Sequence, residues 1–203
     1  MSLAEPRVQR LAAVLAAVVL SIGVSACSSD ASSIAAQARS GDGKGFGSGA
    51  GTLERLALDQ RPAPLTLSGT TLQGTPWKVA DAVHKVLVLN VWGSWCGPCV
   101  AEMPHLQQVW SQMSSAGTPV QFMGINYRDG AETARAFLRA NKITYPSLED
   151  DGGRTLLALH GTANTTPTTL VLDRRGRIAA RVSGPVSVAT LVGLVKDVLG
   201  ESS

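Results

Sequence analysis

The strongest constraint on the fold is an apolar run that leads into a pair of cysteines. Residues 86–92 are almost continuously hydrophobic, which is typical of a strand buried on both faces of a sheet. From about Pro98, apolar residues recur at three- and four-residue steps, which predicts a helix with one buried face. Cys96 and Cys99 therefore lie at a strand-to-helix junction, where they can close a disulfide within one helical turn.

This junction favours redox chemistry. A thiolate at Cys96 is stabilised by the free N–H groups and the dipole of the helix N-terminus, and Pro98 fits the first turn because its missing N–H costs nothing there. Cys99 faces the core and is predicted to be the resolving thiol that attacks a mixed disulfide at Cys96. Half of a zinc site and an inert structural disulfide are the alternatives, and the neighbouring Trp95 and Gly97 favour the redox interpretation.

Strand and helix patterns alternate along the rest of the folded part, which predicts an α/β three-layer domain. Two short strands are expected in residues 65–79, with turns at residues 68–69 and 73–76. Further strands are expected at residues 120–125, near 145, and at 168–172 and 177–182, and helices at residues 131–141, 155–159 and 188–199.

The first 26 residues read as an export signal. Arg7 and Arg10 precede an apolar run of about 14 residues, shorter than the roughly 20 that a spanning helix needs. The run ends in Val-Ser-Ala-Cys27, which resembles the lipobox of bacterial lipoproteins and implies cleavage after residue 26 and a lipid on Cys27. An ordinary secretory signal and an uncleaved, tilted anchor are the alternatives. Each places the remaining chain outside the cytoplasm, and lipidation anchors it to the cell membrane.

The next segment, residues 27–58, is rich in Ser, Ala and Gly and is expected to be a flexible tether. Its glycines at residues 41–49 match neither a P-loop nor a dinucleotide fingerprint. The folded domain is expected at residues 59–203. The chain is 44% hydrophobic and 16% charged, which excludes a disordered protein, and its formal charge of +3 comes from scattered residues, so we expect no nucleic-acid partner.

Residues 95–99 resemble the active site of the thioredoxin superfamily, and Pro104 falls where that superfamily kinks its first long helix. Residues 164–169 resemble the stretch that carries its cis-proline. The resemblance implies a cis bond between Thr166 and Pro167, with the Thr166 backbone facing the cysteines and pairing with substrate peptides. From the residues alone, a trans proline in a turn before a strand would be favoured.

One branch of the superfamily fits best. Asn90 stands where cytoplasmic thioredoxins carry a buried Asp, and residues 89–96 and Glu102 resemble the TlpA/ResA/DsbE-like branch. Residues 124–147 resemble the helix and strand that this branch inserts. The similarity covers roughly residues 60–200. It implies a thioredoxin-like three-layer fold, with a central mixed β-sheet flanked by helices and the TlpA/ResA-type helix–strand insertion.

The resemblance implies a protein-disulfide reductase. In that interpretation Cys96 attacks, Cys99 resolves, and Glu102 tunes the cysteines or shuttles protons; a solvated residue of the first helical turn is the alternative for Glu102. Substrates implied are the haem-attachment cysteines of apocytochrome c, with electrons from a membrane thiol transporter of the CcdA/DsbD type. Copper-site proteins of an oxidase are a second substrate class in the same branch. A disulfide-forming oxidant and a non-catalytic binding lipoprotein remain open.

No metal and no cofactor beyond the redox disulfide is expected. His84, His105 and His160 are widely spaced, and Cys27 is remote from the other cysteines. The copper chaperones of the superfamily separate their cysteines by three residues, whereas two residues intervene here. The sequence context of a peroxidatic cysteine, Pro-x-x-x-Thr-x-x-Cys, is absent.

Overall fold

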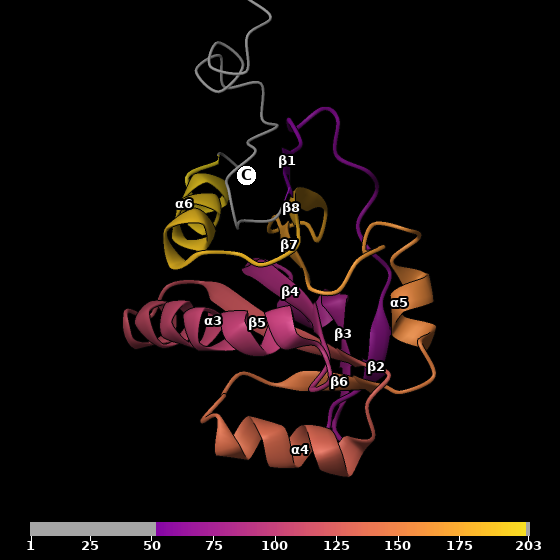
Figure 1. Cartoon of the computed structure of the whole chain (residues 1–203). Helices are drawn as coiled ribbons and strands as arrows, with labels where there is room; N and C mark the ends of the chain where they lie inside the picture. Colours follow the sequence, from indigo (N-terminus) through magenta and orange to yellow (C-terminus); the bar gives the residue numbers. More distant parts are fainter. Residues whose placement is uncertain (1–51, 202–203) are drawn as a thin grey trace, which may run out of the picture. The chain divides into compact units, whose positions relative to one another are not determined.

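The computed structural model describes residues 52–201 as a sheet with helical layers on both faces (Figure 1). Among these residues, no helix is long and apolar enough to cross a membrane. The elements in chain order are β1 (Thr52–Arg55), β2 (Ser68–Thr70), β3 (Pro76–Lys78), the 3-10 helix η1 (Val79–Ala82), β4 (Val86–Trp92), α3 (Gly97–Ser115), β5 (Val120–Tyr127), α4 (Ala131–Ala140), β6 (Ser147–Asp150), α5 (Arg154–Ala158), β7 (Thr168–Leu172), β8 (Ile178–Ser183) and α6 (Val188–Leu199).

The main sheet is mixed, with the strand order β1-β8-β7-β4-β5-β6. Strands β4, β5 and β6 are parallel, whereas β7 is antiparallel to β4 and β8 to β7. All seven residues of β4 are buried, as its unbroken apolar run predicts. This central strand ends at Trp92, so the segment that follows it emerges at the middle of one sheet edge.

Successive side chains of β4 point to opposite faces of the sheet and contribute to two hydrophobic clusters, one on each face. Val86, Val88 and Trp92 pack in the cluster that holds the buried faces of α3, α4 and α6. Leu87, Leu89 and Val91 pack in the cluster with the β2–β3 hairpin, η1 and the end of α5. The thioredoxin-like three-layer fold and its helix–strand insertion, here α4 and β6, are thus confirmed.

Two expectations about local structure are wrong. Residues 52–55 fall in the expected tether yet form β1, because β8 offers a free edge with which they pair antiparallel. Residues 68–69, expected to turn, instead lie in β2, where Ser68 pairs with Lys78 and Gly69 with Trp77. Residues 1–51, which hold the signal segment, Cys27 and most of the expected tether, lie outside the described residues.

Candidate functional site

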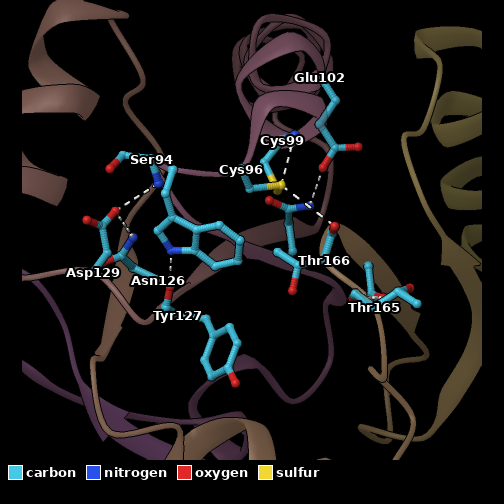
Figure 2. The surroundings of a disulfide bond; sticks show 12 residues. Ser94, Cys96, Cys99, Glu102, Asn126, Tyr127, Asp129, Thr165 and Thr166 are labelled. Atoms are coloured by element: carbon cyan, nitrogen blue, oxygen red, sulfur yellow. Dashed lines mark hydrogen bonds between the residues drawn. A yellow bond between two sulfur atoms is a disulfide. The ribbon is translucent and has the colours of Figure 1, made fainter.

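The two cysteines form a disulfide at the first turn of α3 (Figure 2). Cys96 is the N-cap residue, and its sulfur accepts a hydrogen bond from the backbone N–H of Cys99 at 3.3 Å. Cys99 is fully buried and Cys96 is 5% exposed, while Gly97 and Pro98 between them are exposed. The helix terminus therefore places Cys96 next to the surface and Cys99 behind it, the order that an attacking and a resolving thiol require.

The predicted proline loop lies against the disulfide. The Thr166–Pro167 peptide bond is cis, as the resemblance implied. The sulfur of Cys96 lies 3.6 Å from the carbonyl oxygen of Thr166, although the two residues are 70 positions apart (Figure 2). Pro167 in turn accepts a hydrogen bond from the N–H of Gly184 at 2.9 Å. A free backbone edge beside the cysteine can pair with an extended peptide.

Glu102 lies inside the protein, so the alternative of a solvated residue is wrong. Its side chain is 2% exposed and lies one helical turn after Cys99. One carboxylate oxygen accepts from Nδ2 of Asn90 at 2.8 Å, and the other accepts from the backbone N–H of Val186 at 2.9 Å. Burial raises the pKa of Glu102 to about 7, and these two hydrogen bonds only partly oppose the shift. The carboxyl group can therefore gain or lose a proton near neutral pH.

A second loop holds the segment before Cys96 in place. The N–H of Ser94 donates to Oδ2 of Asp129 at 2.8 Å, and Nε1 of Trp95 donates to the backbone oxygen of Tyr127 at 3.0 Å. Tyr127 ends β5 and Asp129 lies in the loop between β5 and α4, where Asn126 also donates to Asp129 (Figure 2). This loop thus fixes the path along which the chain enters the disulfide.

Trp95 covers the rim of the site, as its place beside Cys96 predicts. The residue is 55% exposed, and its ring meets that of Tyr127 edge-on at 6.4 Å between centroids. Gly93 makes room for it, because a Cβ there would lie 2.5 Å from Nε1 of Trp95.

Sequence reasoning did not single out Asp129 or Tyr127. Tyr127 ends β5 and Asp129 follows it. Strands β4 and β5 are parallel neighbours, and Trp92, the last residue of β4, pairs with Asn126, the last but one of β5. The carboxyl ends of adjacent parallel strands meet at one edge of a sheet. The polar run Asn126 to Asp129 at the end of a buried strand was the signal that could have found them.

Outside the disulfide, the site offers no donor set of the kind that metals need. Within residues 52–201, no three His, Cys, Asp or Glu side chains gather closely enough to hold an ion. The geometry instead places a disulfide, a helix N-terminus, a buried acid and an exposed backbone edge together. These groups can carry out thiol–disulfide exchange, with the acid close enough to influence the charge on sulfur.

Comparison with known proteins agrees with this chemistry. The AhpC/TSA family matches residues 60–181, more than half of the chain. A probable thiol:disulfide interchange protein DsbE-2 of Pasteurella multocida is 37% identical over 134 residues, which are 64% of this chain and 66% of that protein. The thiol:disulfide interchange protein HelX of Rhodobacter capsulatus is 33% identical over 103 residues, 51% of this chain and 54% of that protein. The chain thus spans less than two thirds of the length of each of these two relatives.

A solved structure is similar over nearly its whole length. The secreted thiol-disulfide isomerase of Corynebacterium glutamicum superposes with a TM-score of 0.70 at 31% identity, and the match covers 77% of this chain and 97% of that one. The chain therefore belongs to the AhpC/TSA family of thioredoxin-fold proteins, and it is similar to thiol–disulfide oxidoreductases of the DsbE type.

Proposed function

We propose that the protein reduces disulfides of other proteins outside the cytoplasm. The observation that carries the direction is the buried carboxyl of Glu102 one turn from Cys99. A strong oxidant owes its potential to a stabilised thiolate in its reduced form. A negative charge in a dry environment near the cysteines opposes that thiolate. The arrangement therefore favours the disulfide of this protein and makes its dithiol a better electron donor.

The exchange runs in two balanced steps. The Cys96 thiolate attacks one sulfur of a substrate disulfide, so that a mixed disulfide forms and the other substrate sulfur leaves as a thiolate. Cys99 then gives up its proton and attacks Sγ of Cys96, which releases the second substrate thiolate. Two electrons pass from the protein to the substrate, the Cys96–Cys99 disulfide is restored, and Glu102 is the nearby group that can take up the proton of Cys99.

We further propose the haem-attachment cysteines of apocytochrome c as the substrate, which places the protein in cytochrome c maturation. The support is the resemblance of residues 89–96 and Glu102 to the TlpA/ResA/DsbE-like branch. The same resemblance supports a membrane thiol transporter of the CcdA/DsbD type as the electron donor. The lipobox-like residues before Cys27 support a lipid anchor in the cell membrane.

The first test is the reduction potential of the Cys96–Cys99 couple in the full chain, measured by equilibration with defined thiol–disulfide buffers. We expect a value near or below about −250 mV, close to the roughly −270 mV of thioredoxin. A value near the roughly −120 mV of DsbA would make the protein a disulfide donor and overturn the proposed direction.

The substrate is tested in the organism. Deletion of the gene should lower holo-cytochrome c, and a copy carrying Cys96→Ser should fail to restore it. Normal cytochromes together with misoxidised exported proteins would point to an oxidant instead. A Cys96→Ser protein that still restores holo-cytochrome c would show that the fold acts as a binding module, without exchange.

A further inference from the structure

Asn90 is a buried polar residue inside the apolar strand β4. It is 2% exposed and interrupts a run of hydrophobic side chains six residues before Cys96. Its side chain points to the same face of the sheet as those of Val88 and Trp92, the face that α3 covers. A buried amide costs free energy unless its polar atoms find partners. The contacts of its two polar atoms therefore decide whether the strand tolerates it.

The donor atom of this amide is fully used, whereas its acceptor atom is not. Nδ2 donates to Oε1 of Glu102 at 2.8 Å and lies 3.2 Å from Oγ1 of Thr169. Oδ1 is buried and has no partner among the described residues. The amide can exchange these two atoms by turning over about its terminal bond, because that torsion is roughly two-fold. One end of the amide lacks a partner in either orientation, so the two orientations differ mainly in the bond to Glu102.

The carboxyl group of Glu102 requires different partners in its two charge states. As a carboxylate it only accepts hydrogen bonds, which the amide of Asn90 and the backbone N–H of Val186 provide. As a neutral acid it carries a proton that it must donate, and an N–H group cannot accept that proton. Oδ1 of Asn90 can accept it once the amide has turned over, and the hydroxyl of Thr169 can then donate to Oδ1 instead of accepting from Nδ2. The same three side chains thus satisfy both states of the acid.

Few other titratable groups in the described part of the chain surround Glu102. On its own helix, Cys99 is buried one turn before it and Cys96 lies nearer the surface (Figure 2), whereas His105 is exposed. In the loop before β6, burial and the charge of Glu102 raise the pKa of the Tyr145 hydroxyl, which therefore stays neutral. Strands β4 and β7 and the loop before α6 contribute only the neutral contacts given above. The buried group with which Glu102 can exchange a proton is therefore the Cys99 thiol.

We propose that Asn90 positions Glu102 for proton transfer with Cys99, and that its amide turns over as the acid gains and loses the proton. During exchange, the Cys99 thiol gives its proton to the carboxylate. The sulfur keeps the electron pair and attacks Sγ of Cys96 in the mixed disulfide, which releases the substrate thiolate. The neutral acid donates to Oδ1 of Asn90 until it releases the proton to solvent, and the amide then returns.

Asn90 acts through Glu102 and not on the sulfur atoms, so it is a positioning residue. This proposal rests on the proposed function, because the proton concerned is that of the resolving thiol. It predicts that Asn90 affects the step carried out by Cys99 and leaves the attack by Cys96 unchanged.

The first test resolves these two steps in the full chain, reduced beforehand and mixed with the chromogenic disulfide dithiobis(nitrobenzoate). All proteins carry Cys27→Ser, which removes the third thiol of the chain. Cys96 attacks the reagent and releases one coloured nitrothiobenzoate; Cys99 then closes the protein disulfide and releases the second. The first phase depends on the reagent concentration and the second does not, so stopped-flow absorbance separates them.

The variant is Asn90→Leu, which is similar in size and has neither a donor nor an acceptor. It should slow the second phase about tenfold at neutral pH, because a misplaced base loses part of its effect, and leave the first phase unchanged. The difference should shrink at alkaline pH, where Cys99 ionises without a base. A second phase that is unchanged, or slowed equally at every pH as a packing defect would slow it, overturns the proposal.

Ser147→Ala is the matched control. Ser147 is buried in the same row of the sheet as Asn90, with Gly124 between them, but it accepts the hydrogen bond of Trp92 at 3.2 Å and does not serve Glu102. Its replacement also removes a buried polar group from this face of the sheet. It should change neither phase.

A second measurement uses the unaltered, oxidised protein and so does not depend on how a variant folds. Solution NMR follows the carboxyl carbon of Glu102 and the side-chain amide of Asn90 during a pH titration. Both signals should change with one shared midpoint, and the amide protons should lose their nuclear Overhauser contact with Thr169 as the acid becomes neutral. A contact that persists at every pH while Glu102 titrates would show a fixed amide and contradict the proposal.

The outcomes separate the two proposals. If wild-type protein releases only one nitrothiobenzoate, Cys99 does not resolve the mixed disulfide and the proposed function fails. If it releases both, and Asn90→Leu does so at the same rates, the proposed function stands and only the role of Asn90 is overturned.

Discussion

The side-chain amide of Asn90 on β4 donates to the carboxyl group of Glu102 on α3 at 2.8 Å. This bond joins the central strand to the helix that carries the disulfide, and neither group reaches solvent. The same amide nitrogen lies 3.2 Å from Oγ1 of Thr169 on β7, so three elements meet at one buried amide. Glu102 therefore gains or loses its proton inside the protein, and this titration directly changes the free energy of unfolding.

We predict that folding stability falls between pH 4.5 and pH 7 because of Glu102. Its pKa is about 7 in the folded protein, against an ordinary value of 4.5. The folded state therefore binds this proton more tightly, and stability is lost as pH rises through this window. The full effect is about 3 kcal/mol.

The variant that checks this is Glu102→Gln, which keeps the shape of the side chain. Its amide can donate to Oδ1 of Asn90, an atom without a partner in the described structure. Urea unfolding at pH 5 and pH 8 should show a smaller difference in stability for the variant than for the wild type. Equal pH dependence in both proteins would contradict the assignment.

The same substitution should alter the cysteines. Without a charge one turn from Cys99, the thiol pKa values should fall and the reduction potential should rise. The absorbance of the thiolate near 240 nm, followed against pH, measures the first effect, and thiol–disulfide buffers measure the second. A merely structural role for Glu102 would leave both unchanged once the variant is shown to be folded.

The two cysteines should differ strongly in reactivity. Cys96 borders the exposed Gly97 and Pro98, whereas Cys99 is fully buried. We expect iodoacetamide to label Cys96 in a reduced Cys99→Ser protein at least about tenfold faster than Cys99 in a reduced Cys96→Ser protein. Mass spectrometry of the digested protein assigns the label, and comparable rates would refute the order of attack given above.

Gly93→Ala should disturb the rim of the site. The new methyl would lie 2.5 Å from Nε1 of Trp95 and 3.0 Å from the backbone oxygen of Tyr127, so the indole has to move and its hydrogen bond to Tyr127 is lost. We expect a cost of about 1–3 kcal/mol. Chemical denaturation measures it, with Trp95→Phe as the control that removes the clashing indole: the cost of Gly93→Ala should be smaller in that background.

A buried ion-pair network far from the disulfide should affect stability and leave the redox chemistry unchanged. The guanidinium of Arg61, 3% exposed, donates to Asp173 at 3.0 Å and to Glu201 at 2.7 Å. Because β7 runs antiparallel to β4, Asp173 lies at the end of the sheet opposite Cys96. Arg61→Met should cost about 2 kcal/mol, because Asp173 and Glu201 each lose a charged hydrogen-bond donor while Asp173 keeps Arg177, with no change in reduction potential.

Much of the architecture could be predicted because its signals are local. The apolar run of β4 and the three- and four-residue periodicity after Pro98 depend only on neighbouring residues, and both proved accurate. The edge strand β1 was missed because a four-residue segment has little pattern of its own and its pairing with β8 is tertiary. Residues 68–69 were misread as a turn because Ser-Gly is a common turn signal, whereas their pairing with β3 appears only in the folded chain.

The residues of the site also fall into those predictable from local sequence and those that depend on distant contacts. Cys96 and Cys99 lie three residues apart at the start of α3, so their spacing in the sequence alone predicts a redox disulfide. The burial of Glu102 depends on Val186, which is 84 residues away, and no sequence periodicity reports such a contact. Asp129 is tied to the site by a bond across 35 residues and required knowledge of which strands are neighbours.

The short strand β1 begins at the same end of the sheet as the disulfide. Thr52, Ser183, Thr168 and Val91 form one row across four strands, so Thr52 stands about 14 Å from the end of β4 that leads to Cys96. A bulky group attached just before Thr52 would hinder the access of partner proteins to the disulfide. A reporter domain fused at the carboxyl-terminal end would leave access to Cys96 open.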